Sequence, residues 1–289
     1  MIEKALLFGE AKSLVGVITR PENAPSSARP GVIILNAGVI HRVGPNRMHV
    51  RLARELARHG FLSMRFDFSG LGDSAPRADS AAFAQATVKE TRQAMEVLAS
   101  TADVYSFVLV GICSGADHAL RAAGHDERVV GAVLIEPYSV PAPSFLWYSY
   151  RHKVLSPRSW WRLLSGRSEV LGTIKERRTE MRAQEAAPPT VETIVPEPEE
   201  LVRQVRGLLD RGTELCFVYS AESPAYFNYR SLLQRGLREH IAAGRVCLRV
   251  LKQTDHVFTP LAAQESLVTG IRDWAVGVAE RRTSGVRGG

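Results

Sequence analysis

Apolar runs rich in β-branched residues recur along the chain, and amphipathic stretches separate them. The most continuous runs predict strands buried on both faces at Gly31–Asn36, Ser106–Gly111, Val129–Ile135 and Glu214–Ser220. Shorter runs predict strands at Leu14–Thr19, Phe61–Phe66 and Arg245–Leu251. Helical periodicity covers Arg47–His59, Ala81–Ser100, Ala116–His125, Tyr226–Ala243 and Leu261–Glu280. This alternation predicts an α/β fold with a mostly parallel sheet and helices on both faces.

One segment, residues 137–198, interrupts the alternation of strands and helices. It contains three of the four tryptophans, several arginines and a proline-rich end. We interpret it as a helical lid inserted into a core made of residues 1–136 and 199–280. Residues 281–289 are expected to form a flexible tail.

The overall composition is that of a globular protein with a sizeable core. Of 289 residues, 45% are hydrophobic, and the formal net charge is +7. A basic chain has either a solvated basic surface or an anionic partner, such as an acidic acyl-carrier protein or a membrane surface. Neither a nucleic-acid-binding motif nor a long apolar run or leader is present, so we expect a cytoplasmic protein without a transmembrane segment that does not bind nucleic acid.

The three cysteines predict neither a disulfide framework nor a zinc site. Their number is odd and no pair has CxxC spacing. Cys216 and Cys247 lie in apolar runs and are expected to be small core residues. We therefore expect no metal and no cofactor, and only Cys113 lies in a setting that predicts chemistry.

Cys113 stands at the centre of a nucleophile-elbow pattern. Residues 106–119 are SFVLVGICSGADHA, which is a buried strand, a G-x-C-x-G turn and the start of a helix. The flanking Gly111 and Gly115 allow strand and helix to approach closely around a strained turn. The positive end of the helix dipole favours a thiolate at Cys113. A buried structural cysteine in a fold that has lost its catalysis is the alternative.

An oxyanion hole requires two backbone N–H donors that point to the same place. The residue after the nucleophile, Ser114, is expected to supply one of them. The loop after the strand Gly31–Asn36 is expected to supply the other, through Val39. His41 and Arg42 follow in this loop, where they would meet an anionic substrate group.

Four segments resemble the α/β-hydrolase superfamily, and within it the hydrolases associated with exosortase and exopolysaccharide gene clusters. They are NAGVIHRVGPNR (36–47), RFDFSGLGDS (65–74), GICSGAD (111–117) and TDHVF (254–258). The G-x-C-x-G pattern is also similar to that of dienelactone hydrolases, although the surrounding residues differ. The resemblance implies ester, thioester or amide chemistry without a cofactor, and it implies that Asp67, Gly70, Gly72 and Ser74 are structural.

The same resemblance assigns the partners of Cys113. His256, in the loop before the last helix, is the expected general base, because the superfamily orders its residues as nucleophile, acid, histidine. Glu222, after the strand Glu214–Ser220, is the expected acid, although relatives commonly carry the acid at the position held here by Ser223. Asp255 and Glu136 remain alternatives to Glu222.

The predicted function is therefore hydrolysis of an ester or thioester through a thioacyl intermediate at Cys113. An acyltransferase that passes the acyl group to an amine, alcohol or thiol is the second hypothesis, and a non-catalytic binding protein is the third. Aromatic and basic residues alternate in the expected lid, where Trp147 and Trp160 are candidates to cover the acyl group of a small or carrier-bound substrate. The sequence leaves the oligomeric state open.

Overall fold

The computed structural model describes residues 1–23, 29–137, 198–221 and 236–286. The expected lid with Trp147 and Trp160 lies outside these residues, apart from its two end positions. The expected acid Glu222 and most of the expected helix Tyr226–Ala243 also lie outside them.

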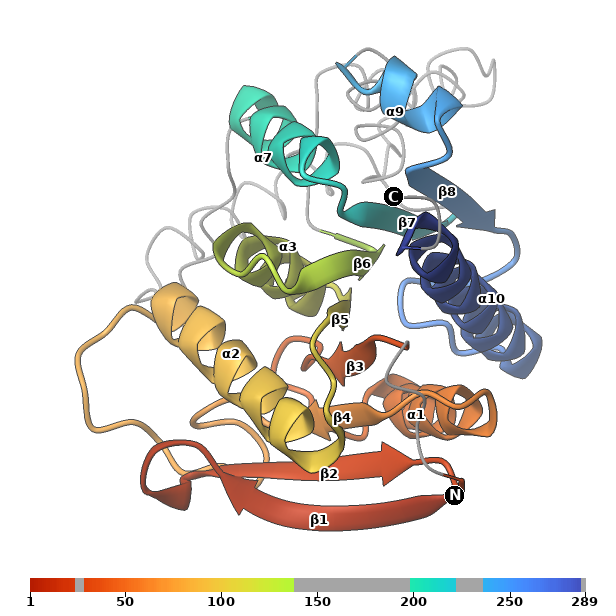
Figure 1. The fold of residues 1–289 in the computed structure, drawn as a ribbon. Coiled ribbons are helices and arrows are strands. Elements are labelled where there is room, and N and C mark those ends of the chain that lie inside the picture. Colours follow the sequence, from red (N-terminus) through yellow and green to blue (C-terminus); the bar gives the residue numbers. More distant parts are fainter. Residues whose placement is uncertain (24–28, 138–197, 222–235, 287–289) are drawn as a thin grey trace, which may run out of the picture. The chain divides into compact units, whose positions relative to one another are not determined.

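Within the described residues, eight strands form one mostly parallel sheet in the order β1-β2-β4-β3-β5-β6-β7-β8 (Figure 1). From β4 to β8 neighbouring strands are parallel, whereas β2 runs antiparallel to both β1 and β4. The strands are β1 Ile2–Phe8, β2 Leu14–Arg20, β3 Gly31–Ile34, β4 Ser63–Phe66, β5 Phe107–Ile112, β6 Val129–Ile135, β7 Glu214–Ser220 and β8 Val246–Leu251. The sequence prediction of a mostly parallel sheet is confirmed.

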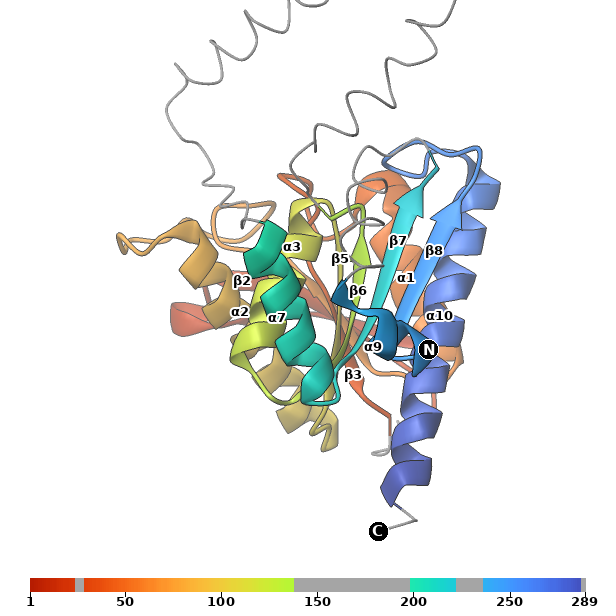
Figure 2. The ribbon, with the colours of Figure 1, turned by 90° about the horizontal axis from the view of Figure 1, so that it is seen from above.

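Helices cover both faces of the sheet (Figure 2). Helices α1 (Met48–Arg58) and α10 (Leu261–Val286) pack on one face, and α2 (Phe83–Ala102), α3 (Ser114–His125) and α7 (Pro198–Asp210) pack on the other. The remaining described helices are the short α9 (Arg238–Ala242) and two 3-10 turns, Glu10–Lys12 and Pro45–Arg47.

The central strands are apolar throughout because each of their faces meets a layer of helices. In β5, Phe107 and Leu109 join the cluster with α2, α3 and α7, whereas Val108 and Val110 join the cluster with α1 and α10. All four side chains are buried. Successive side chains of a strand point to opposite faces, so burial on both faces requires an unbroken apolar run.

Three elements differ from the sequence prediction. The sequence of strand β1 does not alternate clearly between apolar and polar residues, because most of its residues are exposed, so the sequence pattern did not predict this strand. Helix α7 follows the proline-rich stretch and buries an apolar stripe that includes Leu201, Val205 and Leu208. Helix α10 continues to Val286, into the segment that the sequence assigns to a flexible tail. There the Thr283 hydroxyl donates to the Ala279 carbonyl.

Candidate active site

The carboxyl ends of the parallel strands bring the candidate residues together. The strand order reverses at β3, because β4 and β5 both follow β3 in sequence and lie on opposite sides of it. In open α/β sheets, ligands bind in the crevice at such a reversal, outside the carboxyl ends of the strands. Cys113 follows β5 directly, and the loop after β3 faces it across this crevice.

Cys113 has the backbone geometry of a nucleophile elbow. Its φ and ψ are 55° and −127°, and its N–H donates to the Ile135 carbonyl at 2.8 Å. A Cβ on Gly111 would lie 2.0 Å from the Gly115 carbonyl oxygen, and one on Gly115 would lie 2.2 Å from the Asn36 carbonyl oxygen. Glycine is therefore required on both sides of the turn, and the strained conformation presents a half-buried Cys113 side chain at the start of α3.

Two glycines of α3 provide a matched test of this packing. Gly115→Ala is expected to destabilise the protein by about 2 kcal/mol, because the new methyl group overlaps the backbone of Asn36. Gly124→Ala in the same helix meets nothing within 4 Å and is expected to stabilise the protein by up to about 1 kcal/mol. Urea unfolding of both variants measures the two effects. Equal stabilities would contradict the close approach of α3 to the loop after β3.

Glu136 is the carboxylate closest to the histidine among the candidate acids that the structure describes. It follows β6 directly with φ 48°, and its side chain is fully buried. The Ser220 N–H donates to its Oε1 atom, and its Oε2 atom lies 3.4 Å from the His256 Nδ1 atom. The ends of β6 and β7 thus hold this carboxylate in a fixed orientation toward His256.

His256 connects Glu136 to Cys113. Its ring forms an ion pair with Glu136 and interacts with the Cys113 side chain, and about half of the His256 side chain (53%) is exposed. The interaction with Cys113, and next the one with Glu136, raise the pKa of His256 to about 10, against the opposing effect of burial. An imidazole with this pKa is protonated at neutral pH and can donate from both ring nitrogens.

The other two candidate acids are placed differently. Asp255 is exposed, and its Oδ1 atom accepts the Thr259 N–H at 2.8 Å. Its carboxylate therefore stabilises the turn before α10. Glu222 lies outside the described residues. Of the two acids that the structure describes, Glu136 is the one in contact with His256.

Two other histidines are buried and unsuited to proton transfer. Burial lowers the pKa of His49 to about 4, with a further effect of the nearby Arg65. Burial likewise lowers the pKa of His118 to about 4, and its ring packs edge-on against Phe68 and Phe83. Both imidazoles are neutral at physiological pH and contribute to packing.

The loop after β3 presents Gly38 rather than Val39 to the elbow. The Gly38 N–H donates to the Ser114 Oγ atom at 3.0 Å. The loop turns tightly here, with Gly38 at φ 56° and a bridge between Ala37 and Ile40. The side chain of Val39 is 77% exposed. Because the Gly38 N–H points at Ser114, Gly38 joins the expected Val39 as a candidate for the second oxyanion donor.

A buried carboxylate anchors this loop. Asp67, at the end of β4, accepts hydrogen bonds from the Arg42 N–H, the Arg42 guanidinium and the Asn36 amide. Arg42 also pairs with Asp73 at 2.7 Å. A Cβ on Gly72 would lie 2.3 Å from Asp67 Oδ2, and the Ser74 hydroxyl donates to the Asp67 carbonyl. The guanidinium that the sequence offers for substrate binding is thus engaged in an internal ion pair.

His41 is the exposed residue beside this ion pair. Its Nδ1 atom accepts the Val43 N–H at 3.4 Å. His41 stays a candidate for contact with substrate, whereas the position of Arg42 supports a role in shaping the loop.

Arg42→Met is expected to destabilise the protein by about 3 kcal/mol. The change leaves the fully buried Asp67 carboxylate without its cation, and breaking a buried ion pair from one side carries a penalty of about this size. Arg20→Met, at the exposed end of β2, is the matched control and is expected to change the free energy of unfolding by less than about 0.5 kcal/mol. Equal unfolding midpoints for the two variants would contradict the anchoring role of Arg42.

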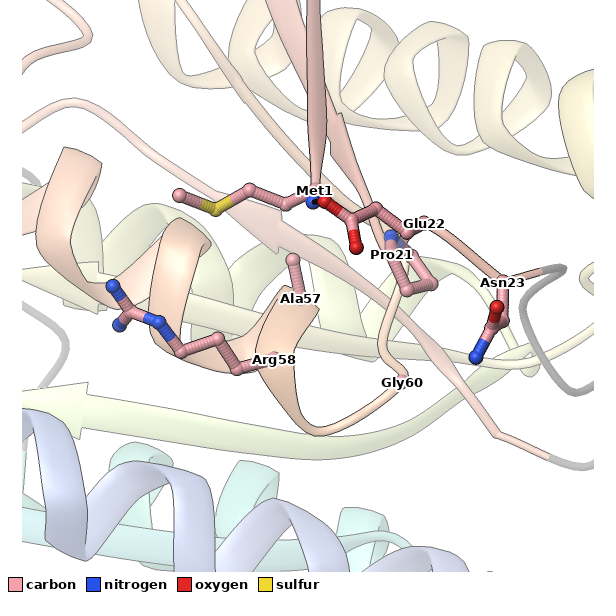
Figure 3. A pocket seen from close by; sticks show the side chains of 7 residues that line it. All are labelled: Met1, Pro21, Glu22, Asn23, Ala57, Arg58 and Gly60. Carbon is pink, nitrogen blue, oxygen red and sulfur yellow. Dashed lines mark hydrogen bonds and ion pairs between the residues drawn. The ribbon is translucent and has the colours of Figure 1, made fainter.

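Elsewhere in the described residues the structure shows no metal-binding cluster. They contain no group of three or more metal-ligating side chains. A cavity of about 640 Å³ opens at the opposite, amino-terminal edge of the parallel strands, lined by Met1, Pro21, Glu22, Asn23, Ala57, Arg58 and Gly60 (Figure 3). Its charges are engaged elsewhere, because the N-terminal amine binds Glu22 and Arg58 binds Glu55. No helix in the described ranges is long and apolar enough to cross a membrane.

Comparison with known proteins identifies the fold. Neither a protein-family model nor a curated protein matches the chain. A proline iminopeptidase of Mycobacterium smegmatis is similar at 18% identity and a TM-score of 0.57, over 97% of this chain and 99% of that chain. An alpha/beta hydrolase of Penicillium sp. sh18 is similar at 15% identity and a TM-score of 0.58, over 98% of this chain and 100% of that chain. The esterase domain of a Rhodothermus marinus protein is similar at 16% identity and a TM-score of 0.57, over 95% of this chain and 98% of that chain. The chain has the α/β-hydrolase fold, as the sequence predicts.

Proposed function

We propose that this protein is a cysteine-dependent acyl hydrolase that cleaves an ester or thioester through a thioacyl intermediate at Cys113. The observation that carries the proposal is the position of His256, which interacts with the Cys113 side chain and lies 3.4 Å from the buried carboxylate of Glu136. Nucleophile, proton carrier and orienting acid are the three parts that covalent acyl transfer requires.

His256 carries the proton in the first half of the cycle. It takes the Cys113 proton, as the sequence predicts, and its raised pKa of about 10 favours holding that proton. The Cys113 sulfur attacks the acyl carbonyl, and a carbon–sulfur bond forms. His256 then gives its proton to the leaving group as a general acid.

The second half of the cycle returns the site to its starting state. His256, now neutral, accepts a proton from a water molecule that attacks the thioacyl carbon. The carbon–sulfur bond breaks, the free acid leaves, and the Cys113 sulfur is released beside His256, which again carries the proton. Glu136 orients the ring through Nδ1 in both halves of the cycle.

The oxyanion that forms in both halves is assigned to the backbone N–H groups of Ser114 and Gly38. Ser114 begins α3, where the helix dipole favours negative charge. The Gly38 N–H is occupied by the Ser114 hydroxyl in the absence of substrate. A rotation of this hydroxyl about χ1 would release the N–H for a carbonyl oxygen, so no movement of the backbone is needed.

Two finer features of the proposal come from the sequence. Residues 137–198 are proposed to cover the acyl group, with Trp147 and Trp160 as contacts, and the basic residues around them would suit an acidic carrier protein. Among the solved structures with this fold are an iminopeptidase and an esterase domain, so the fold accommodates hydrolysis of both amides and esters in those proteins.

Product analysis separates the proposed hydrolase from an acyltransferase. The protein is incubated with p-nitrophenyl esters and pantetheine thioesters of short and long acyl chains, with and without an added amine, alcohol or thiol. Free acid released without an acceptor supports hydrolysis. Product that forms only with an acceptor would identify an acyltransferase and contradict the proposed water-dependent step. Absence of turnover on every substrate would contradict both and favour a non-catalytic binding protein.

A further inference from the structure

A second pair of thiols lies apart from the candidate active site. Cys216 of β7 and Cys247 of β8 are direct partners in the register of these parallel strands. Neighbouring strands are about 4.8 Å apart, and disulfides join Cα atoms about 4.4–6.8 Å apart. Both cysteines are free. The register therefore places them where a disulfide could form with little movement of the backbone.

The two thiols differ in their access to solvent. Cys216 is fully buried, in the cluster between the sheet and α10. Cys247 is half-buried on β8, which is the last strand of the sheet among the described residues. Of the two residues, Cys247 is therefore the more accessible to a small solute.

The surrounding charges distinguish the two thiols further. Arg249 lies two residues after Cys247, on the same face of β8. The interaction with Cys216, and next the one with Arg249, hold the pKa of Cys247 below its ordinary value despite burial. The interaction with Cys247, together with burial, raises the pKa of Cys216. Cys247 is therefore the more readily ionised of the two thiols.

We propose that Cys216 and Cys247 are a peroxide-oxidised pair, in which Cys247 is the attacking thiol and Cys216 resolves it into a disulfide between β7 and β8. This inference does not depend on the function of Cys113. It assigns a modification site to two residues that the sequence predicts to be inert parts of the core.

The oxidation requires a hydroperoxide as the electron acceptor. The Cys247 thiolate attacks one peroxide oxygen, the O–O bond breaks, and the other oxygen leaves as water or an alcohol after taking up a proton. Cys247 is then a sulfenic acid. The Cys216 sulfur attacks the Cys247 sulfur, the S–S bond forms, and hydroxide leaves with the Cys216 proton as water. In total two thiols become one disulfide and one hydroperoxide is reduced.

The test uses the full chain with Cys113→Ala, so that the third thiol does not react, alongside the wild type. Each protein is treated with hydrogen peroxide, denatured, alkylated and analysed by intact mass and peptide mapping. We expect a mass lower by two hydrogen atoms, no alkylation of Cys216 or Cys247, one cross-linked peptide, and full reversal by dithiothreitol. Two alkylated thiols after treatment, or stable oxygenated Cys247 beside an unreacted Cys216, would overturn the proposal.

Two variants test the separate roles. Cys216→Ala is expected to stop the reaction at the Cys247 sulfenic acid, which dimedone traps. Arg249→Gln is expected to slow oxidation of Cys247 about tenfold, which is the effect of about one pKa unit on the thiolate fraction. Arg245→Gln, just before β8, is the matched control and is expected to leave the rate unchanged. Equal rates for the two arginine variants, or no dimedone adduct in Cys216→Ala, would count against the assigned roles.

Discussion

Cys113→Ala is expected to lower kcat/KM for the best acyl substrate by at least about 10³-fold, because the variant has no atom that can form the thioacyl intermediate. The substitution keeps the Cβ and the backbone of the elbow, so thermal unfolding should be little changed. Steady-state kinetics of purified protein measures the effect.

Two further cysteine variants make this result specific. Cys247→Ala removes another half-buried thiol and is expected to retain wild-type activity. Cys113→Ser keeps an oxygen nucleophile but is expected to be much less active than the wild type, because a serine hydroxyl is a weaker nucleophile than a thiol and depends more on an oriented base. Full activity in Cys113→Ala would show that the nucleophile lies elsewhere.

Glu136→Gln is expected to lower kcat by about 10²-fold and to move the alkaline limit of activity. Glutamine keeps an acceptor for the Ser220 N–H but removes the negative charge beside His256. The pKa of His256, raised to about 10 in the folded protein, should therefore fall. In the wild type, activity is lost as pH rises through about 10, where the imidazolium loses its proton. In the variant the same loss occurs at lower pH.

The raised pKa of His256 also predicts how the free energy of unfolding changes with pH. A histidine whose pKa is raised by folding stabilises the folded state fully below its ordinary pKa, and this contribution is lost as pH rises toward about 10. The pH dependence of stability between neutral pH and pH 10 should therefore be weaker in Glu136→Gln than in the wild type. Denaturant unfolding at several pH values measures it.

Asp255→Asn and Glu222→Gln are the control variants for the assignment of Glu136 as the acid that orients His256. Asp255 holds the Thr259 N–H, and its variant should leave the alkaline limit in place. Glu222 is the acid expected from the resemblance. A greater loss of activity in Glu222→Gln than in Glu136→Gln would contradict the assignment of Glu136.

The central strands and the elbow could be predicted from the sequence because they depend on neighbouring residues. The β6 and β7 ranges match their apolar runs, Val129–Ile135 and Glu214–Ser220. The elbow depends on five consecutive residues, and the clashes that a Cβ would make at Gly111 and Gly115 explain their presence. Edge strand β1 gave no such signal, because exposed polar residues interrupt its apolar pattern.

The choice of acid and of the second oxyanion donor depended on long-range geometry. Glu136 and Glu222 each follow a strand, and the sequence alone does not give the distance of either strand end from His256. The available signal was that Glu136 is a charged residue directly after a fully apolar strand, β6, next to the strand that bears Cys113. Gly38 joins Val39 as a candidate donor because of the tight turn between Ala37 and Ile40, which local patterning does not reveal.

The most direct measurement is the mass of the protein during turnover. Wild type and Cys113→Ala are mixed with a reactive acyl ester, quenched in acid at short times and analysed by intact mass and peptide mapping. The account predicts one acyl group on the wild type, located at Cys113, which forms before product appears and disappears as free acid is released. Turnover without an acyl group on Cys113, or an equal adduct in Cys113→Ala, would contradict it.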